Sequence, residues 1–189
     1  QLASDLCQTW LPAATTRGLT LTWTGPEHLE ARVDDDKLER SITNLISNAL
    51  KFTPSGGHVG VTMTVQGDHF EISVSDTGVG IDEDFKSRIF GRFEQNRAPV
   101  NSPVSGSGLG LSLVKELTEA HGGSVEVADR PGGGTIFRVR MPIAGPTRNS
   151  SSSEVEAAPT SVPPPPRRSG DRMDDDRVPM RLRPEDFGQ

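Results

Sequence analysis

Asn44-Leu45-Ile46-Ser47-Asn48-Ala49-Leu50-Lys51-Phe52-Thr53 is the most informative stretch of this 189-residue sequence. It continues an apolar pattern that begins before it, which predicts an amphipathic helix over residues 35–52. At about 100° per residue, Asn44, Asn48 and Lys51 fall within roughly a 60° arc, opposite the apolar positions. Asn side chains tend to bond their own backbone, so two of them one turn apart in a helix need a reason. We predict that this face binds Mg²⁺ and phosphate, with a solvated polar face as the alternative.

A carboxylate ends the apolar face of a strand predicted over residues 70–76. Apolar residues alternate along this strand, and by the period of two Asp76 shares their face. Burying a carboxylate without a partner is costly, so Asp76 needs a hydrogen-bond donor. Thr77-Gly78-Val79-Gly80 follows with little side-chain bulk, which lets a planar ligand with an amino group, such as adenine, approach. The alternative interpretation is that Asp76 caps a helix that starts after Asp82.

Glycines precede a second helix, which is predicted over residues 109–121. Gly106-Ser107-Gly108-Leu109-Gly110-Leu111 would leave backbone N–H groups free at the helix N-terminus, where the helix dipole favours phosphate. The glycines do not follow a strand, as the dinucleotide-binding fingerprint requires, so a Rossmann fold is not expected. Residues 95–105 show no apolar periodicity, and we predict that they form a mobile lid over the site.

Helical and strand periodicities alternate along the first 144 residues. Helices are predicted over residues 2–16, 35–52 and 109–121, with about ten more helical residues after Asp82, and strands over residues 19–24, 59–65, 70–76, 124–128 and 135–141. Thr135 begins the last strand in register with its apolar residues, so it places a polar group at the mouth of that face. The strands suit antiparallel hairpins rather than repeated βαβ units. The predicted fold class is therefore an α+β two-layer sandwich, a mixed β-sheet with helices packed on one face.

The composition changes sharply after Met141-Pro142. The remainder holds a serine run at residues 150–153, four consecutive prolines at residues 163–166 and few apolar residues. Such a segment buries too little apolar surface to offset its chain entropy. We therefore predict one domain over residues 1–144 and a disordered tail or linker over residues 145–189, with a proline-rich docking motif as the alternative for the tail.

Charge, cysteine content and hydropathy argue against several classes of protein. The formal net charge is −6 and no basic stripe with interleaved aromatic residues occurs, so nucleic acid is not an expected partner. Cys7 is the single cysteine and cannot form an internal disulfide. No apolar run approaches the ~20 residues of a membrane span, so this segment is not expected to contact a membrane. Because the sequence starts in mid-pattern at Gln1, we expect it to be part of a longer protein.

Five short motifs, taken in order, resemble the nucleotide-binding boxes of sensor histidine kinases. Residues 44–53 resemble the N box, Asp76-Thr77-Gly78-Val79-Gly80-Ile81 the first glycine box, and Phe90-Gly91-Arg92-Phe93 the F box. Residues 106–111 resemble the second glycine box, and Gly132-Gly133-Gly134-Thr135 the third. The resemblance covers about residues 1–144. It implies the Bergerat ATP-binding fold, which histidine kinases share with gyrase B, Hsp90 and MutL.

The same resemblance implies which residues bind ATP and Mg²⁺. Asn48 would coordinate the metal ion, while Asn44 and Lys51 would be the catalytic residues along the triphosphate. Asp76 would accept a hydrogen bond from the N6 amino group of adenine, and Arg92 would contact phosphate. The implied nucleotide-binding set is Asn44, Asn48, Lys51, Asp76, Gly78, Gly80, Ile81, Phe93, Gly106, Gly108, Leu109, Gly110, Leu111 and Thr135.

As for function, the resemblance implies the catalytic domain of a two-component sensor histidine kinase. Such a domain transfers the γ-phosphoryl group of MgATP to a histidine on a dimerisation domain, for relay to an aspartate of a response-regulator receiver domain. The parent protein would be a homodimer, with this domain in the cytoplasm even where the parent is anchored in the cell membrane. None of the four histidines has the setting of the acceptor, which is expected outside this sequence.

Two other activities of the same superfamily are the alternatives, a conformational switch ATPase and an anti-sigma-type serine kinase. Switch ATPases carry a glutamate base four residues before the metal-binding asparagine. Asn44 stands at that position here, and an amide cannot accept the proton of an attacking water. The sequence therefore favours phosphoryl transfer over hydrolysis.

Overall fold

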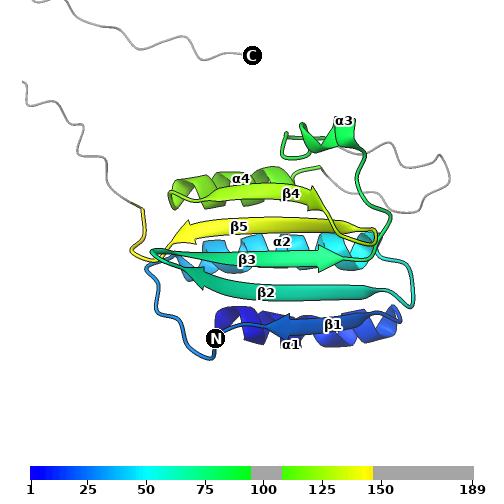
Figure 1. Ribbon diagram of the computed structural model, residues 1–189, viewed down its shortest axis with the longest axis horizontal. Coiled ribbons are helices and arrows are strands. Elements are labelled where there is room, and N and C mark those ends of the chain that lie inside the picture. The colour runs from blue at the N-terminus through cyan, green and yellow to red at the C-terminus, as the bar shows by residue number, and fades with distance from the viewer. Residues whose placement is uncertain (95–107, 147–189) are drawn as a thin grey trace, which may run out of the picture. The chain divides into compact units, whose positions relative to one another are not determined.

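The computed structural model describes residues 1–94 and 108–146 (Figure 1). These residues form four helices and five strands. In chain order they are α1 (Leu2–Thr16), β1 (Thr20–Thr24), α2 (Asp35–Phe52), β2 (His58–Gln66), β3 (His69–Asp76), α3 (Glu83–Lys86), α4 (Gly110–Ala120), β4 (Ser124–Asp129) and β5 (Thr135–Pro142). Except for α3, each predicted helix and strand ends within one residue of its predicted bounds.

The five strands form one mixed sheet in the order β1-β2-β3-β5-β4. The pairs β2–β3, β3–β5 and β4–β5 are antiparallel, whereas β1 and β2 pair in parallel and are connected through α2. A parallel neighbour needs a long crossover, so β1, α2 and β2 form one βαβ unit within the mixed sheet. The register places Ser75 opposite Ile136, which brings the carboxyl end of β3 beside the start of β5.

Helices α1, α2 and α4 cover one face of the sheet, with α2 in contact with both of the others (Figure 1). α1 packs on β1, α2 on β2 and β3, and α4 on β4 and β5. This arrangement confirms the predicted two-layer α+β sandwich with its helices on one face of a mixed sheet.

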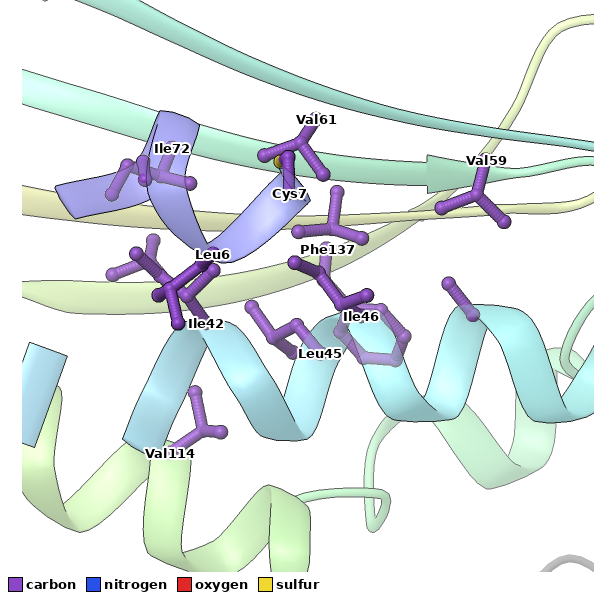
Figure 2. Close-up of a cluster of buried hydrophobic side chains, with 14 of the residues drawn as sticks. Leu6, Cys7, Ile42, Leu45, Ile46, Val59, Val61, Ile72, Val114 and Phe137 are labelled. Carbon is purple, nitrogen blue, oxygen red and sulfur yellow. The ribbon is translucent and has the colours of Figure 1, made fainter. Parts of the chain in front are cut away.

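The core lies between the helices and the sheet (Figure 2). The apolar stripe of α2 points into it, and Leu45 and Ile46 are fully buried. Burial of this stripe fixes the rotation of α2 about its axis, so the face with Asn44 and Asn48 turns away from the core. The labelled side chains are Leu6, Cys7, Ile42, Leu45, Ile46, Val59, Val61, Ile72, Val114 and Phe137.

α3 is shorter than the sequence predicted, with four residues where about ten were expected. Beyond Lys86 the chain continues in tight turns, in which the N–H of Arg88 bonds the carbonyl of Phe85 and the N–H of Gly91 bonds that of Arg88. These i to i+3 bonds replace the α-helical pattern, and Gly91 is a poor helix former. The apolar residues Phe85 and Ile89 are nevertheless buried, so this segment is anchored to the core.

Within residues 1–94 and 108–146, no helix combines the length and apolarity that crossing a membrane requires. The longest described helix, α2, has 18 residues and begins with a charged turn.

Candidate nucleotide-binding site

Asp76 ends β3 as a buried carboxylate, with 5% of its surface exposed. Its Oδ1 accepts a hydrogen bond from the N–H of Gly78 at 2.7 Å. Burial raises the pKa of Asp76 above its ordinary value, against hydrogen bonds from the backbone of Gly78 and Thr135 and the charge of Arg130, which act in the opposite direction. The helix-capping interpretation is wrong, because the N-cap residue of α3 is Asp82.

Two glycines let the backbone close around Asp76. A Cβ on Gly78 would lie 2.5 Å from the carbonyl oxygen of Phe52, the last residue of α2, so only glycine fits there. Gly134 has a φ of +102°, and its Cβ would lie 2.0 Å from the carbonyl oxygen of Asp76. The loop after β3 and the turn before β5 therefore meet at the end of α2 without side chains between them.

The polar face of α2 meets the start of α4. The Nδ2 group of Asn44 donates a hydrogen bond to the carbonyl of Arg40 at 2.8 Å. A Cβ on Gly110, the first residue of α4, would lie 2.7 Å from the Oδ1 atom of Asn44. Asn48 is half-buried one turn further along α2, and the Nζ atom of Lys51 lies 5.0 Å from the ring centre of Phe52. These contacts bring the predicted N box and second glycine box together.

Phe93 of the F box contacts Gly108, which is the first described residue before α4. The N–H of Phe93 donates to the carbonyl of Gly108 at 2.9 Å, and both residues have positive φ. A Cβ on Gly108 would lie 2.8 Å from the Cα of Phe93, so glycine is needed at this position. Arg92, a predicted phosphate contact, donates hydrogen bonds to Glu116 of α4 from Nε and Nη2, at 3.0 and 2.6 Å.

The predicted residues form two groups at one end of the sheet. Asp76, Gly78, Gly80 and Thr135 lie where β3 and β5 meet, and Asn44 lies against Gly110, with the contact between Phe52 and Gly78 joining the groups. Ile81 and Leu111 are partly buried against the core, whereas Leu109 and Phe93 are exposed. Gly106 and the predicted lid at residues 95–105 lie outside the described residues. The binding roles of all these residues remain predictions.

The donor set on α2 fits a magnesium ion that is held mainly by phosphate. In the described part of the chain, no group of three or more His, Cys, Asp or Glu side chains could hold a metal alone. Mg²⁺ commonly takes only one or two protein oxygens and completes its shell with phosphate oxygens and water. The amide oxygen of Asn48 could serve as such a ligand, and the oxygen of Asn44, one turn earlier, lies near the start of α4.

Sequence reasoning missed Arg130 as a residue of this site. Its Nη1 atom donates to the carbonyls of Pro131 and Gly133, both at 3.3 Å, and so braces the turn that precedes Thr135. Its positive charge also acts on Asp76. The signal in the sequence was an arginine directly before the turn Pro131-Gly132-Gly133-Gly134.

A mixed sheet with one helical face, a buried aspartate at a strand end and an amide-bearing helix define an ATP-binding domain of the Bergerat class. A family model described as "Histidine kinase-, DNA gyrase B-, and HSP90-like ATPase" matches residues 33–145, and the chain belongs to this family. The family predicted from the sequence motifs is thereby confirmed, and ATP is its nucleotide.

The similar proteins are sensor histidine kinases, which confirms the predicted kind of catalytic domain. Sensor histidine kinase TmoS of Ectopseudomonas mendocina is 45% identical over 134 residues, 70% of this chain but 14% of TmoS. Histidine protein kinase DivJ of Caulobacter vibrioides is 42% identical over 118 residues, 62% of this chain and 20% of DivJ. The chain thus spans only a small part of these relatives.

Solved structures of histidine kinases share the fold. Full-length ShkA in complex with AMPPNP is 32% identical, with a TM-score of 0.64 over 76% of this chain and 30% of that one. The catalytic domain of histidine kinase ThkA has a TM-score of 0.68 at 23% identity, over 76% of this chain and 92% of that one. ThkA in complex with the response regulator TrrA has a TM-score of 0.64 at 22% identity, over 76% of this chain and 40% of that one.

Proposed function

We propose that this chain binds MgATP and, within its parent protein, transfers the γ-phosphoryl group to a histidine on a dimerisation domain outside this sequence. The observation that carries the proposal is Asp76, a buried carboxylate at the end of β3 with glycine backbone on two sides. An ionised carboxylate only accepts hydrogen bonds and has more acceptor sites than the backbone N–H groups of Gly78 and Thr135 use. The exocyclic amino group of adenine is a donor that suits the remaining sites.

Each group of site residues then has a distinct task. Asp76 orients the adenine, with Gly80 and Thr135 beside the base. Asn44, Asn48 and Lys51 lie along the triphosphate, and backbone N–H groups of residues 106–110 surround its outer phosphates. Mg²⁺, when bound at Asn48, neutralises charge on the phosphate oxygens. Catalysis is then mainly the positioning of the γ-phosphate for in-line attack by the acceptor imidazole.

Asn44 favours transfer to a protein acceptor over transfer to water. Its Nδ2 group is bonded to the carbonyl of Arg40, and its amide oxygen cannot take up a proton at neutral pH. An attacking water at this position would therefore lack a base, whereas a neutral imidazole is itself a sufficient nucleophile. This arrangement keeps ATP intact until the acceptor histidine arrives.

The proposed phosphoryl transfer implies two protein partners. We infer that the parent is a homodimer through its dimerisation domain, and that a response-regulator receiver domain takes the phosphoryl group from the histidine. The structure of ThkA with the response regulator TrrA supports the second partner. A cytoplasmic location of this domain, whether the parent protein is soluble or anchored in a membrane, and a tail or linker over residues 145–189 belong to the same proposal.

Titration calorimetry with Asp76→Asn tests the adenine contact. The amide presents a donor toward the amino group of adenine, so the loss of one charge-assisted hydrogen bond should weaken MgATP binding roughly ten- to hundredfold, or ~1.5–3 kcal/mol. Asp68→Asn is the matched control, because that carboxylate is exposed in the turn between β2 and β3. If Asp76→Asn bound MgATP as tightly as the unsubstituted chain does, Asp76 would not hold adenine.

A further inference from the structure

His121 lies where the end of α4 meets the start of α2, and its side chain is buried, with 6% of the residue exposed. Its Nδ1 atom lies 2.7 Å from the carbonyl oxygen of Leu117, within α4. Its Nε2 atom lies 3.2 Å from the backbone nitrogen of Asp34, the N-cap residue of α2. The imidazole ring thus joins the main chains of two helices, and we call these two contacts the His121 clamp.

The two partners determine where the ring carries its proton. A backbone N–H can only donate, so Nε2 must accept, and a carbonyl can only accept, so Nδ1 must donate. The clamp therefore requires a neutral ring with its proton on Nδ1. An apolar ring of the same size would leave the N–H of Asp34 and the carbonyl of Leu117 without these partners.

The same two helices also lie close together at the other end of α4. Gly110 begins α4 and lies against Asn44 of α2, so close that a Cβ on Gly110 would lie 2.7 Å from the Asn44 amide oxygen. The His121 clamp lies at the end of α4 and the glycine contact at its start. α2 and α4 are therefore in close contact at both ends of α4.

The helices that are fixed in this way carry the residues proposed to surround the phosphates. α2 holds Asn44, Asn48 and Lys51, and α4 starts in the second glycine box. The 11 residues of α4 span about 16 Å, so a small rotation at His121 becomes a shift of an ångström or more at Gly110. Phosphoryl transfer is sensitive to displacements of that size.

We infer that His121 is a positioning residue for the phosphates of ATP, and that it acts by holding α4 against the N-terminus of α2. This inference rests on the proposed function. Asp76 and Thr135 lie on β3 and β5 rather than on the two clamped helices, so the adenine contact does not depend on the clamp. Loss of the clamp should therefore affect ATP and adenosine differently.

The experiment uses the full 189-residue chain, either unsubstituted or carrying His121→Phe or His121→Gln. It measures the affinity of each chain for MgATP and for adenosine. We expect His121→Phe to weaken MgATP binding about tenfold while adenosine affinity stays within about twofold. His121→Gln keeps one donor and one acceptor and should regain part of the loss. Leu21→Ala, in the core at the far edge strand β1, is the control for general loss of stability and should leave the ratio of the two affinities unchanged.

Nitrogen NMR of the histidine rings in the unsubstituted chain reports which ring nitrogen carries the proton, without any ligand. The clamp predicts a neutral His121 ring with the proton on Nδ1. A proton on Nε2 would overturn the inference, as would equal losses for both ligands or an unchanged MgATP affinity in His121→Phe. If the unsubstituted chain bound neither ligand, the proposed function would be overturned as well. Failure of the inference and failure of the proposed function can therefore be told apart.

Discussion

Asn48 differs from the other polar residues of α2 in its proposed task, which is to bind the metal rather than the phosphates. Asn48→Asp adds a negative charge beside the triphosphate at almost unchanged size. We expect MgATP affinity to fall about tenfold or more, equivalent to ~1.4 kcal/mol, and its dependence on Mg²⁺ concentration to change, while adenosine affinity stays the same. Calorimetry with both ligands at several Mg²⁺ concentrations measures this.

A matched control for this charge is Gln66→Glu, which makes the same change of amide to carboxylate at the exposed end of β2. It should leave both affinities unaltered. Equal losses of ATP and adenosine affinity in Asn48→Asp would show that Asn48 does not lie at the metal.

The buried carboxyl group of Asp76 should also make the stability of the ligand-free domain depend on pH. Burial raises its pKa above the ordinary 3.8, so the folded state holds the proton more tightly than the unfolded state does. The resulting stability is fully present below the unfolded pKa and is lost as pH rises through the higher folded pKa. Asp76→Asn does not titrate. The free energy of unfolding of this variant relative to the unsubstituted chain should therefore increase as pH rises from about 4 toward neutrality.

Urea unfolding of both chains without nucleotide, at several pH values in that window, provides the measurement. All other titrating groups are common to both chains and cancel in the difference. A difference that stays constant or decreases with pH would mean that burial does not dominate the environment of Asp76.

At the scale of the helix, Gly110 opposes the ordinary preference of its element. Alanine in a helix is favoured over glycine by about 1 kcal/mol, so propensity alone predicts that Gly110→Ala is stabilising. Its Cβ would, however, lie 2.7 Å from the Asn44 amide oxygen and would displace that side chain. We expect MgATP affinity to fall at least about tenfold, whatever the change in stability.

Lys115→Ala is the control for this substitution, because Lys115 is an exposed residue of the same helix. Thermal unfolding and calorimetry on both variants separate stability from binding. Retention of full MgATP affinity by Gly110→Ala would show that the close contact between α2 and α4 has no part in the site.

Most helices and strands could be predicted from the sequence because their apolar periods are regular. The apolar stripe of α2 and the alternating apolar residues of β3 pack into the same core, so each element has one buried face. α3 was overestimated because charged residues that favour helices continue beyond Lys86, whereas turn bonds and Gly91 end the helix. The parallel pairing of β1 and β2 has no local signature, since it depends on where α2 returns the chain.

The candidate site was predictable where a residue type is unusual for its element, as with the amides of α2 and the carboxylate that ends β3. Contacts made through the backbone were not predictable in the same way. The role of Gly134 depends on a distance to the carbonyl of Asp76, and that of His121 on two main-chain partners 4 and 87 residues away. Such contacts exist only after distant segments have come together.

At the scale of the whole molecule, we expect this chain to bind ATP without completing a reaction. Incubated alone with γ-labelled ATP, it should hydrolyse ATP slowly and retain no label, because Asn44 replaces the hydrolytic base and no acceptor histidine is expected in it. Mixed with the dimerisation helices of its parent, it should label a histidine there. The label should be lost in acid and survive base, as a phosphoramidate does.

Two truncated chains serve as controls in the same assay. Deleting residues 146–189 should leave binding and transfer unchanged, whereas deleting residues 95–105 should reduce transfer, if they form the predicted lid. Label on the isolated chain, or rapid turnover without the helices, would favour a serine kinase or a switch ATPase instead.

The pairing of Ser75 with Ile136 has a consequence for the order in which the molecule folds. These strands adjoin although about 60 residues separate them in the chain, so their pairing is a non-local contact, which we expect to form late in folding. β1, α2, β2 and β3 are all synthesised before β5 exists. Because the proposed site places the base between Asp76 on β3 and Thr135 on β5, we expect an incomplete or partly folded chain to lack the adenine pocket and to bind nucleotide only once its last strand has paired.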